Sequence, residues 1–132
     1  MQRNRQSSPR KVRQLRVLLV DDHAISRAAC RALLRTEGID VVADVALDDA
    51  AVAAADGLLP NAVIIDVTPA DRHSLQLARR LRRLPRAPTV LLTSSADRAM
   101  FDSALEAFPF VAKSDLCSEA IFNAIRTEDT PY

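Results

Sequence analysis

Polar side chains that could hold a metal ion and a phosphoryl group follow four of the apolar runs in this sequence. Carboxylates come after two of the runs, hydroxyls after a third and an ammonium after the fourth. Carboxylate oxygens are hard ligands that suit Mg²⁺ or Mn²⁺, and an ammonium can pair with a phosphoryl oxygen. The residues concerned are Asp21 and Asp22, Asp66, Thr93 and Ser94, and Lys113.

The three carboxylates would repel one another if they met at one edge of a sheet, because each also loses hydration there. A divalent cation and the ammonium of Lys113 can offset that cost. One carboxylate could then attack a phosphoryl donor, and the same cations would stabilise the acyl phosphate. Asp66 is the best candidate for the nucleophile, because it follows its apolar run alone.

The elements that must position these residues alternate along the chain. Short apolar runs bounded by polar residues predict strands buried on both faces, and helical spacing fills the segments between them. The predicted strands are 17–20, 39–45, 62–65, 90–92 and 110–112. The predicted helices are 26–37, 50–59, 75–84, 97–108 and 115–126. This alternation predicts an α/β fold with a parallel sheet covered on both faces, whose ligands bind at the carboxyl ends of the strands.

The first predicted helix carries one expectation about packing. Its spacing places Ala29, Cys30, Leu33 and Leu34 on the face toward the sheet, and Gly38 is suited to end the helix. Both cysteines of the chain are expected to behave as small buried hydrophobic residues.

The two histidines are expected to stay outside the chemistry. His23 follows the acidic pair and is interpreted as a residue at the rim of the pocket, whereas His73 is expected in a solvated loop. Two histidines and two cysteines are also too few for a disulfide framework and a poor basis for a zinc site.

Composition places the chain among ordinary globular domains. It has 132 residues, 48% hydrophobic and 27% charged, which fits one domain with one core. No apolar tract approaches the roughly 18 residues that a membrane span needs, and the start of the chain has no apolar signal core. We therefore expect no membrane association and a cytoplasmic location.

The charge is distributed unevenly. Residues 1–16 carry six basic residues and no acidic one, although the net charge of the whole chain is only +1. We expect residues 1–14 to form a basic, disordered arm, 15–126 the folded domain and 127–132 a C-terminal tail.

These motifs, in this order and at these intervals, resemble the receiver domain of bacterial two-component response regulators. The resemblance covers about residues 15–126. The sequence Val-Asp-Asp-His with Arg27 soon after it, and the Lys-Ser-Asp at 113–115, are most similar to receivers of the LuxR/NarL-type branch, which usually carries a helix-turn-helix output domain. The resemblance implies a flavodoxin-like, CheY-like (βα)5 sheet of strand order 2-1-3-4-5.

The resemblance also implies roles for particular residues. Asp66 would accept a phosphoryl group from a sensor histidine kinase or a phosphotransfer protein. The metal, Mg²⁺ or Mn²⁺, would be bound by Asp22 and Asp66 directly, by Asp21 through water and by the backbone carbonyl of Thr68. The phosphate-binding and switch residues would be Thr93, Ser94, Lys113 and Phe110, the last as the switch aromatic.

Two other functions stay open. The loops after Asp66 and before Lys113 depart from the family pattern, so the chain could be an atypical receiver that docks or dimerises without phosphate. A phosphatase or a flavin or nucleotide binder on a similar sheet is disfavoured, because the first strand ends in Asp-Asp-His rather than in a phosphate-binding loop. The leading hypothesis is a phosphoprotein that is not a turnover enzyme, compatible with a homodimer and without a DNA-binding domain in this sequence.

Overall fold

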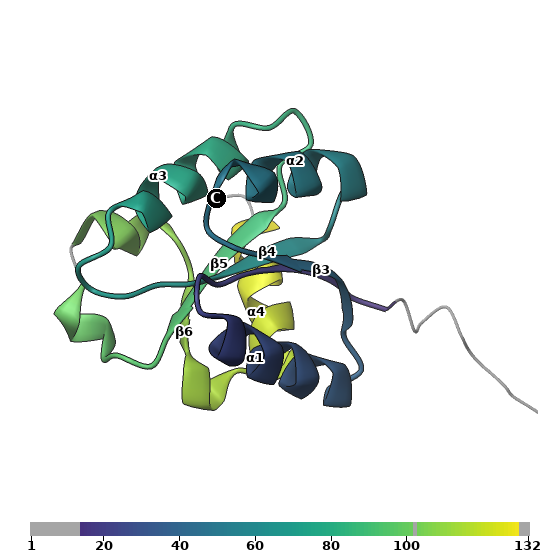
Figure 1. Cartoon of the computed structure of the whole chain (residues 1–132), viewed down its shortest axis with the longest axis horizontal. Helices are drawn as coiled ribbons and strands as arrows, with labels where there is room; N and C mark the ends of the chain where they lie inside the picture. The colour runs from purple at the N-terminus through teal and green to yellow at the C-terminus, as the bar shows by residue number, and fades with distance from the viewer. Residues whose placement is uncertain (1–13, 102, 130–132) are drawn as a thin grey trace, which may run out of the picture.

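The computed structural model describes residues 14–101 and 103–129 and shows alternating strands and helices (Figure 1). The strands, labelled as in Figure 1, are β2 (Arg16–Val20), β3 (Asp40–Val45), β4 (Ala62–Asp66), β5 (Thr89–Ser94) and β6 (Phe110–Ala112). The helices are α1 (Ala24–Thr36), α2 (Asp49–Leu58), α3 (His73–Arg82) and α4 (Ser118–Asp129). Short 3₁₀ segments lie at Arg98–Met100, Ser103–Ala107 and Lys113–Asp115.

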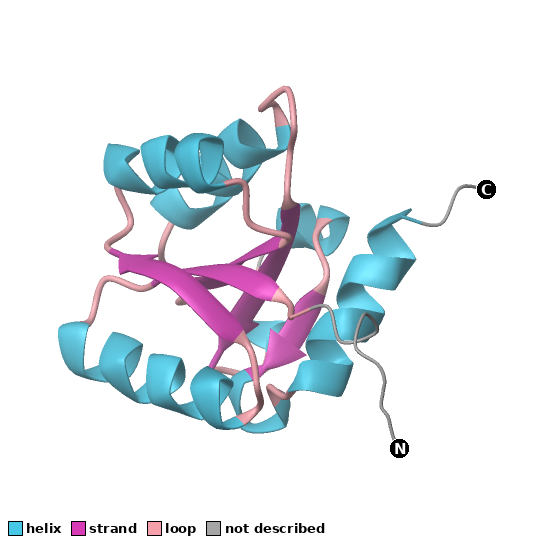
Figure 2. Cartoon of the chain, turned by 90° about the vertical axis from the view of Figure 1, so that its right-hand side faces the viewer, coloured by secondary structure: helices cyan, strands magenta, loops and turns pink. Residues whose placement is uncertain are grey.

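The five strands form one parallel sheet in the order β3-β2-β4-β5-β6. Counted along the chain this is 2-1-3-4-5, so the predicted fold class is confirmed. The sheet forms the middle layer, with helices above and below it (Figure 2).

Alternate residues of each central strand pack on opposite faces, which is why the strands are continuous apolar runs. In β2, Leu18 and Val20 belong to the core under α2 and α3, whereas Val17 and Leu19 belong to the core under α1 and α4. All four side chains are fully buried. The sheet therefore has no solvated face at its centre, and its polar residues are left for the strand ends.

The prediction of a helix over 97–108 is wrong. Two 3₁₀ segments, Arg98–Met100 and Ser103–Ala107, stand there instead, and the backbone of Phe101, directly after the first, is extended (φ −102°, ψ 155°). A helix cannot continue through an extended residue. This conformation places the buried ring of Phe101 at 5.6 Å from that of Phe110. Tertiary packing of one aromatic ring has overridden a loose helical periodicity.

The face of α1 that was expected to be buried is only partly so. Cys30 and Leu34 are buried, but Ala29 and Leu33 are exposed. The row that faces the sheet runs through Ser26, Cys30 and Leu34, spaced four residues apart, so the helix is rotated relative to the prediction. Gly38, with φ +79°, follows the end of the helix as expected.

Three smaller expectations are also revised. His73 is exposed but begins α3 rather than lying in a loop. Cys117 is half-buried rather than buried. The last helix ends at Asp129 rather than at 126.

Of the arm expected at residues 1–14, only Gln14 is among the described residues. Its side chain donates a hydrogen bond to the carbonyl of Gly38 at 3.3 Å. Among the helices of the described residues, none has the length and apolar character needed to cross a membrane.

Candidate functional site

Asp66 and Lys113 form an ion pair at the carboxyl edge of the sheet. Asp66 is the last residue of β4, and Lys113 comes directly after β6. The ammonium of Lys113 contacts Oδ2 of Asp66. The strands that carry these two residues, β4 and β6, are not neighbours, because β5 lies between them. The side chains keep 12% and 26% of their exposure, so the pair is shielded but open on one side.

Ser26 completes this pair as a third polar group. Its hydroxyl donates to Oδ2 of Asp66 at 3.3 Å and accepts from the ammonium of Lys113 at 2.9 Å. Ser26 lies in the first turn of α1 on the row that faces the sheet. The three side chains therefore form a closed ring of hydrogen bonds that joins α1, β4 and the segment after β6.

Asp21 lies behind the ion pair and is almost fully buried. Its Oδ1 accepts a hydrogen bond from the backbone N–H of His23 at 2.9 Å, whereas its buried Oδ2 has no hydrogen-bond donor within the described part of the chain. An unpartnered carboxylate oxygen in a buried position is costly unless a cation satisfies it.

The environment moves the pKa values of Asp21 and Asp66 in opposite directions. Burial, the proximity of Asp21 and their mutual contact raise the pKa of Asp66, although Lys113 opposes that shift. Burial also disfavours the charged form of Asp21. The hydrogen bond from the His23 N–H, the proximity of Ser26 and Asp66, and the charge of Lys113 outweigh burial and lower the pKa of Asp21.

Asp22 faces a cleft of about 240 Å³ that it shares with Asp66. The other residues that line the cleft are His23, Leu47, Thr68 and Asp71. Asp22 is exposed, and its Oδ1 accepts the backbone N–H of Leu47 at 2.7 Å. The carbonyl of Thr68 accepts the N–H of Asp71 at 3.1 Å and so closes a turn at the mouth of the cleft.

The residues present suit a small divalent cation. The orphaned Oδ2 of Asp21 and the cleft shared by Asp22 and Asp66 supply hard, negatively charged oxygens. As the side chains stand, no three acidic, histidine or cysteine side chains of residues 14–101 and 103–129 are gathered as metal ligands. Asp22 would have to release the N–H of Leu47 and turn toward Asp66 to complete the set.

The hydroxyls of Thr93 and Ser94 are engaged with the backbone. Thr93 is fully buried and donates to the carbonyl of Val111 in β6 at 2.7 Å. The hydroxyl of Ser94 accepts the N–H of Ala96 at 3.0 Å. Both residues end β5 beside Asp66, but neither of these hydrogen bonds is directed to the carboxylate.

Phe110 is half-buried on β6, which is separated by β5 from β4, the strand that carries Asp66. Besides its tilted contact with Phe101, its ring has the guanidinium of Arg98 at 5.7 Å from the centroid. The expected switch aromatic is therefore packed between the core and a partly exposed arginine.

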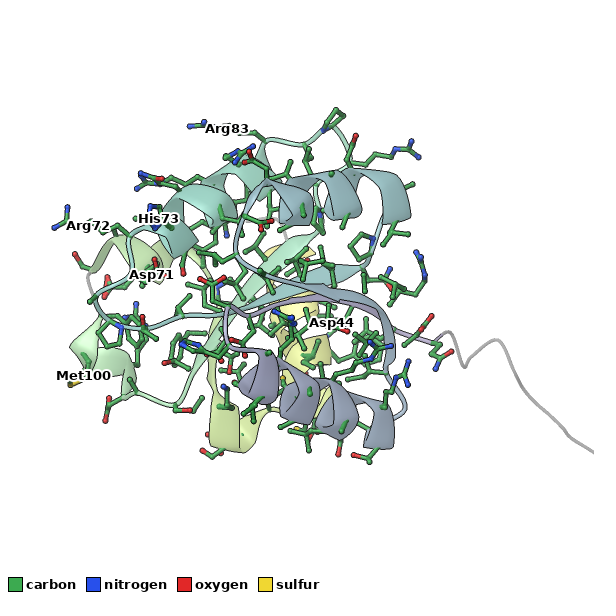
Figure 3. All side chains as sticks on the ribbon, viewed as in Figure 1. Asp44, Asp71, Arg72, His73, Arg83 and Met100 are labelled. Atoms are coloured by element: carbon green, nitrogen blue, oxygen red, sulfur yellow. The ribbon has the colours of Figure 1, made fainter. Side chains whose placement is uncertain are left out.

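Ser26 and the role of Arg27 were not predicted from the sequence. Arg27 donates to the carbonyl of Asp21 at 2.6 Å and to the carboxylate of Asp44 at 3.2 Å, so it fixes the end of β2 against β3. Asp44 lies close to the first turns of α1 in Figure 3, where Arg31 also contacts it. A hydroxyl or an arginine on an amphipathic helix gives no signal by itself. The i, i+4 relation of Ser26 to buried Cys30 could have indicated that Ser26 faces the sheet.

A five-stranded parallel sheet of this order, with a buried Asp21 and the ion pair of Asp66 and Lys113 at its carboxyl edge, defines a receiver-type domain. Comparison with protein families agrees, because the model of the response regulator receiver domain matches residues 17–121. The chain belongs to this family and is the receiver domain of a two-component response regulator, which confirms the resemblance found in the sequence.

Its relatives include regulators of transcription. The transcriptional regulatory protein PdtaR of Mycobacterium tuberculosis is 32% identical over 92 residues, which cover 70% of this chain and 45% of the relative. The chain thus spans less than half the length of this curated relative.

The solved structures that resemble it include receivers of the LuxR/NarL type. The signal receiver domain of the response regulator NarL from Mycobacterium tuberculosis is 26% identical, with a TM-score of 0.65 over 89% of this chain and 98% of that one. A LuxR-family regulator from Aurantimonas sp. SI85-9A1 is 27% identical, with a TM-score of 0.63 over 88% and 85% of the two chains.

Proposed function

We propose that this receiver accepts a phosphoryl group on Asp66 in a reaction that depends on a divalent cation such as Mg²⁺, and that this changes a surface that binds another protein. The observation that carries the proposal is the contact of Lys113 with Asp66, a residue that also lines a cleft together with Asp22. It places a nucleophilic carboxylate, a fixed cation and a second carboxylate at one point. The chemistry is stoichiometric acceptance rather than turnover, and its setting would be cytoplasmic.

The side chains of the site divide the work of phosphoryl transfer. Asp66 provides the attacking carboxylate oxygen, and burial together with the neighbouring Asp21 raises its pKa. Lys113 would move from the carboxylate to a phosphoryl oxygen as negative charge moves onto the phosphoryl group. Mg²⁺ held by Asp21, Asp22, Asp66 and the carbonyl of Thr68 would supply positive charge to the phosphoryl oxygens.

The donor we propose is the phosphohistidine of a sensor kinase or phosphotransfer protein. Next to the cleft, α1 exposes an apolar stripe in which Ile25 is 88% and Leu33 41% exposed. Between them, Ala28, Ala29 and Ala32 are exposed on the same face. A stripe spaced at three and four residues is suited to pack against a partner helix, which would bring the donor histidine to the cleft.

The hydroxyl of Thr93 gives the proposed switch a defined starting state. It now donates to the carbonyl of Val111, which is next to Phe110 in β6. If Thr93 turned toward a phosphoryl oxygen, this bond between β5 and β6 would be lost, and the packing of Phe110 against Phe101 could change with it. Phosphorylation of Asp66 would then change the packing of Phe101 and Phe110 through the hydroxyl of Thr93.

The test is the intact mass of the protein after incubation with Mg²⁺ and either acetyl phosphate or a phosphorylated kinase. We expect the gain of one phosphoryl group, and Asp66→Asn, which keeps the shape of the side chain, should abolish it. A wild-type chain that stays unmodified with both donors would refute the proposal.

A second function has a specific observation in its favour. Asp22 and Thr93 are both held by backbone groups and are turned away from phosphate chemistry, which suits a receiver that docks or dimerises without phosphate. In that case Asp66→Ala would leave partner binding unchanged. Partner pull-down with wild type and Asp66→Ala therefore separates the two functions.

A further inference from the structure

The ammonium of Lys113 has two hydrogen-bond partners among the described residues. One is the carboxylate of Asp66, and the other is the hydroxyl of Ser26, which accepts from the ammonium at 2.9 Å. The same hydroxyl donates to Asp66 at the longer distance of 3.3 Å. The closer partner of Ser26 is therefore the lysine rather than the proposed acceptor.

The two partners of the ammonium differ in what phosphorylation would do to them. Asp66 would lose its negative charge when one of its oxygens forms a bond to phosphorus, so its ion pair with Lys113 would end. The hydroxyl of Ser26 takes no part in that bond, and a hydroxyl can accept one hydrogen bond while it donates another. Of the two partners, only Ser26 is able to hold the ammonium both before and after the transfer.

The position of the hydroxyl is fixed by α1. Ser26 is the third residue of that helix and is half-buried. One helical turn further on, Cys30 is buried in the core under α1 and α4. Next to Ser26, the guanidinium of Arg27 donates to the carbonyl of Asp21 at 2.6 Å and ties the start of the helix to the end of β2. Lys113, in contrast, carries its charge on a flexible four-carbon stem, so the serine is the better fixed of the two groups.

We infer that Ser26 is a positioning residue for Lys113: its hydroxyl holds the ammonium beside the acceptor carboxylate and keeps it there while the charge of that carboxylate is lost. This inference rests on the proposed function. Because Ser26 acts through the lysine, neither oxygen of Asp66 is reserved for it. One oxygen forms the bond to phosphorus, and the other stays available to the divalent cation.

The consequence for phosphoryl transfer can be followed with acetyl phosphate as the donor. An oxygen of Asp66 attacks phosphorus, the bond between phosphorus and the acetate oxygen breaks, and acetate leaves with the electron pair. No proton is taken up or released in this step. An ammonium that is already fixed beside the phosphoryl oxygens stabilises their negative charge without first having to be ordered. The hold of Ser26 on Lys113 should therefore speed the transfer.

Removal of the hydroxyl should slow phosphorylation. Ser26→Ala should lower its initial rate about fivefold, as expected when one modest hydrogen bond to a charged group no longer supports the transition state. Alanine favours a helix more than serine does, so this variant should fold. Ser26→Thr keeps the hydroxyl and should retain the wild-type rate. The matched control is Ser114→Ala, which removes an exposed hydroxyl next to Lys113 in the sequence and should also leave the rate unchanged.

The experiment uses the full chain and two readouts. Wild type and the three variants are incubated with acetyl phosphate and Mg²⁺, and intact mass gives the initial rate at which one phosphoryl group is gained. In parallel, the unphosphorylated proteins are acylated in EDTA with an N-hydroxysuccinimide ester. Because Lys11 and Lys113 are the only lysines of the chain, Lys11 serves as the internal reference in peptide mass spectra. Lys113 should react faster relative to Lys11 in Ser26→Ala, because its ammonium has lost an acceptor, and at the wild-type ratio in the other two variants.

The outcomes separate this inference from the proposed function. Equal initial rates in wild type and Ser26→Ala would overturn the role of Ser26 and leave Asp66 as the acceptor, and so would a rate in Ser26→Thr as low as that in Ser26→Ala. Failure of wild type to gain a phosphoryl group would overturn both the proposed function and this inference. An acylation ratio that does not change in Ser26→Ala would overturn the hold of the hydroxyl on Lys113, whatever the result with phosphate.

Discussion

The backbone N–H of Leu47 donates to Oδ1 of Asp22 at 2.7 Å, and this bond ties an acidic side chain of the cleft to the loop after β3. Asp22→Asn keeps an oxygen acceptor for that N–H but removes the charge that a divalent cation needs. We expect stability in EDTA to change by less than about 0.5 kcal/mol, as for most exposed substitutions, while stabilisation by Mg²⁺ is lost.

The measurement is thermal unfolding with EDTA and with increasing Mg²⁺. A ligand that binds the folded state at 100 times its Kd stabilises by about 2.7 kcal/mol, so wild type should show a concentration-dependent rise in Tm. An equal rise in Asp22→Asn would show that Asp22 takes no part in binding the ion.

Removal of Lys113 should leave Asp66 as a shielded carboxylate beside Asp21. Lys113→Met preserves the length of the side chain without its charge, and loss of one partner from a largely buried pair should cost roughly 2 to 3 kcal/mol at pH 7. Lys113→Met combined with Asp66→Asn should recover most of that loss, because the charge of Asp66 is removed together with that of its partner. Urea unfolding in EDTA measures the stability of the single and of the double variant.

The pH dependence of the Lys113→Met variant has a definite sign. Burial and Asp21 already raise the pKa of Asp66, and loss of the ammonium removes a group that opposes this shift. A carboxyl whose pKa is higher in the folded than in the unfolded state stabilises the fold below the unfolded pKa, and this contribution is lost as pH rises through the folded value. The variant should therefore be closer to wild type in stability near pH 5 than at pH 7. A constant difference across this range would mean that Asp66 is not the destabilising charge.

The strands and the types of residue in the site were predictable from the sequence because both depend on simple patterns. Fully buried strands such as β2 are unbroken apolar runs, and parallel strands place their next residues at one edge, where Asp66 and Lys113 meet. The spacing of these residues also carried the family resemblance, which the match over 17–121 confirms.

Features that depend on tertiary packing were not predictable. The 97–108 segment has apolar residues at helical spacing, but the contact of Phe101 with Phe110 requires an extended residue within it. Similarly, nothing local to Thr93 shows that its hydroxyl would donate to Val111 rather than face the carboxylate. The direction of a hydroxyl is decided by the acceptors that the fold brings to it.

Arg82 should fasten the Ser103–Ala107 segment to α3. Its guanidinium lies 3.9 Å from the ring centroid of Phe108 and donates to the carbonyl of Ala107 at 2.7 Å. Arg82→Ala removes both contacts and should destabilise the domain by about 1 to 2 kcal/mol. Its neighbour in sequence, Arg83, is exposed and projects away from the domain (Figure 3), so Arg83→Ala is the matched control. Equal midpoints of urea unfolding for the two variants would contradict this role of Arg82.

Cys30 should be unreactive in the folded protein, because burial raises the pKa of its thiol to about 11. At pH 8 only about one molecule in a thousand would carry the reactive thiolate, and the side chain is 6% exposed. Iodoacetamide should therefore modify half-buried Cys117 first and reach Cys30 only when urea unfolds the chain, as peptide mass spectra can show.

Since the folded state holds the thiol proton of Cys30 more tightly than the unfolded state, this residue stabilises the fold below about pH 9 and progressively less as pH rises toward 11. Cys30→Ala should reduce that alkaline loss of stability, whereas alkylation of native Cys30 as fast as Cys117 would show that the row Ser26, Cys30, Leu34 is not packed against the sheet.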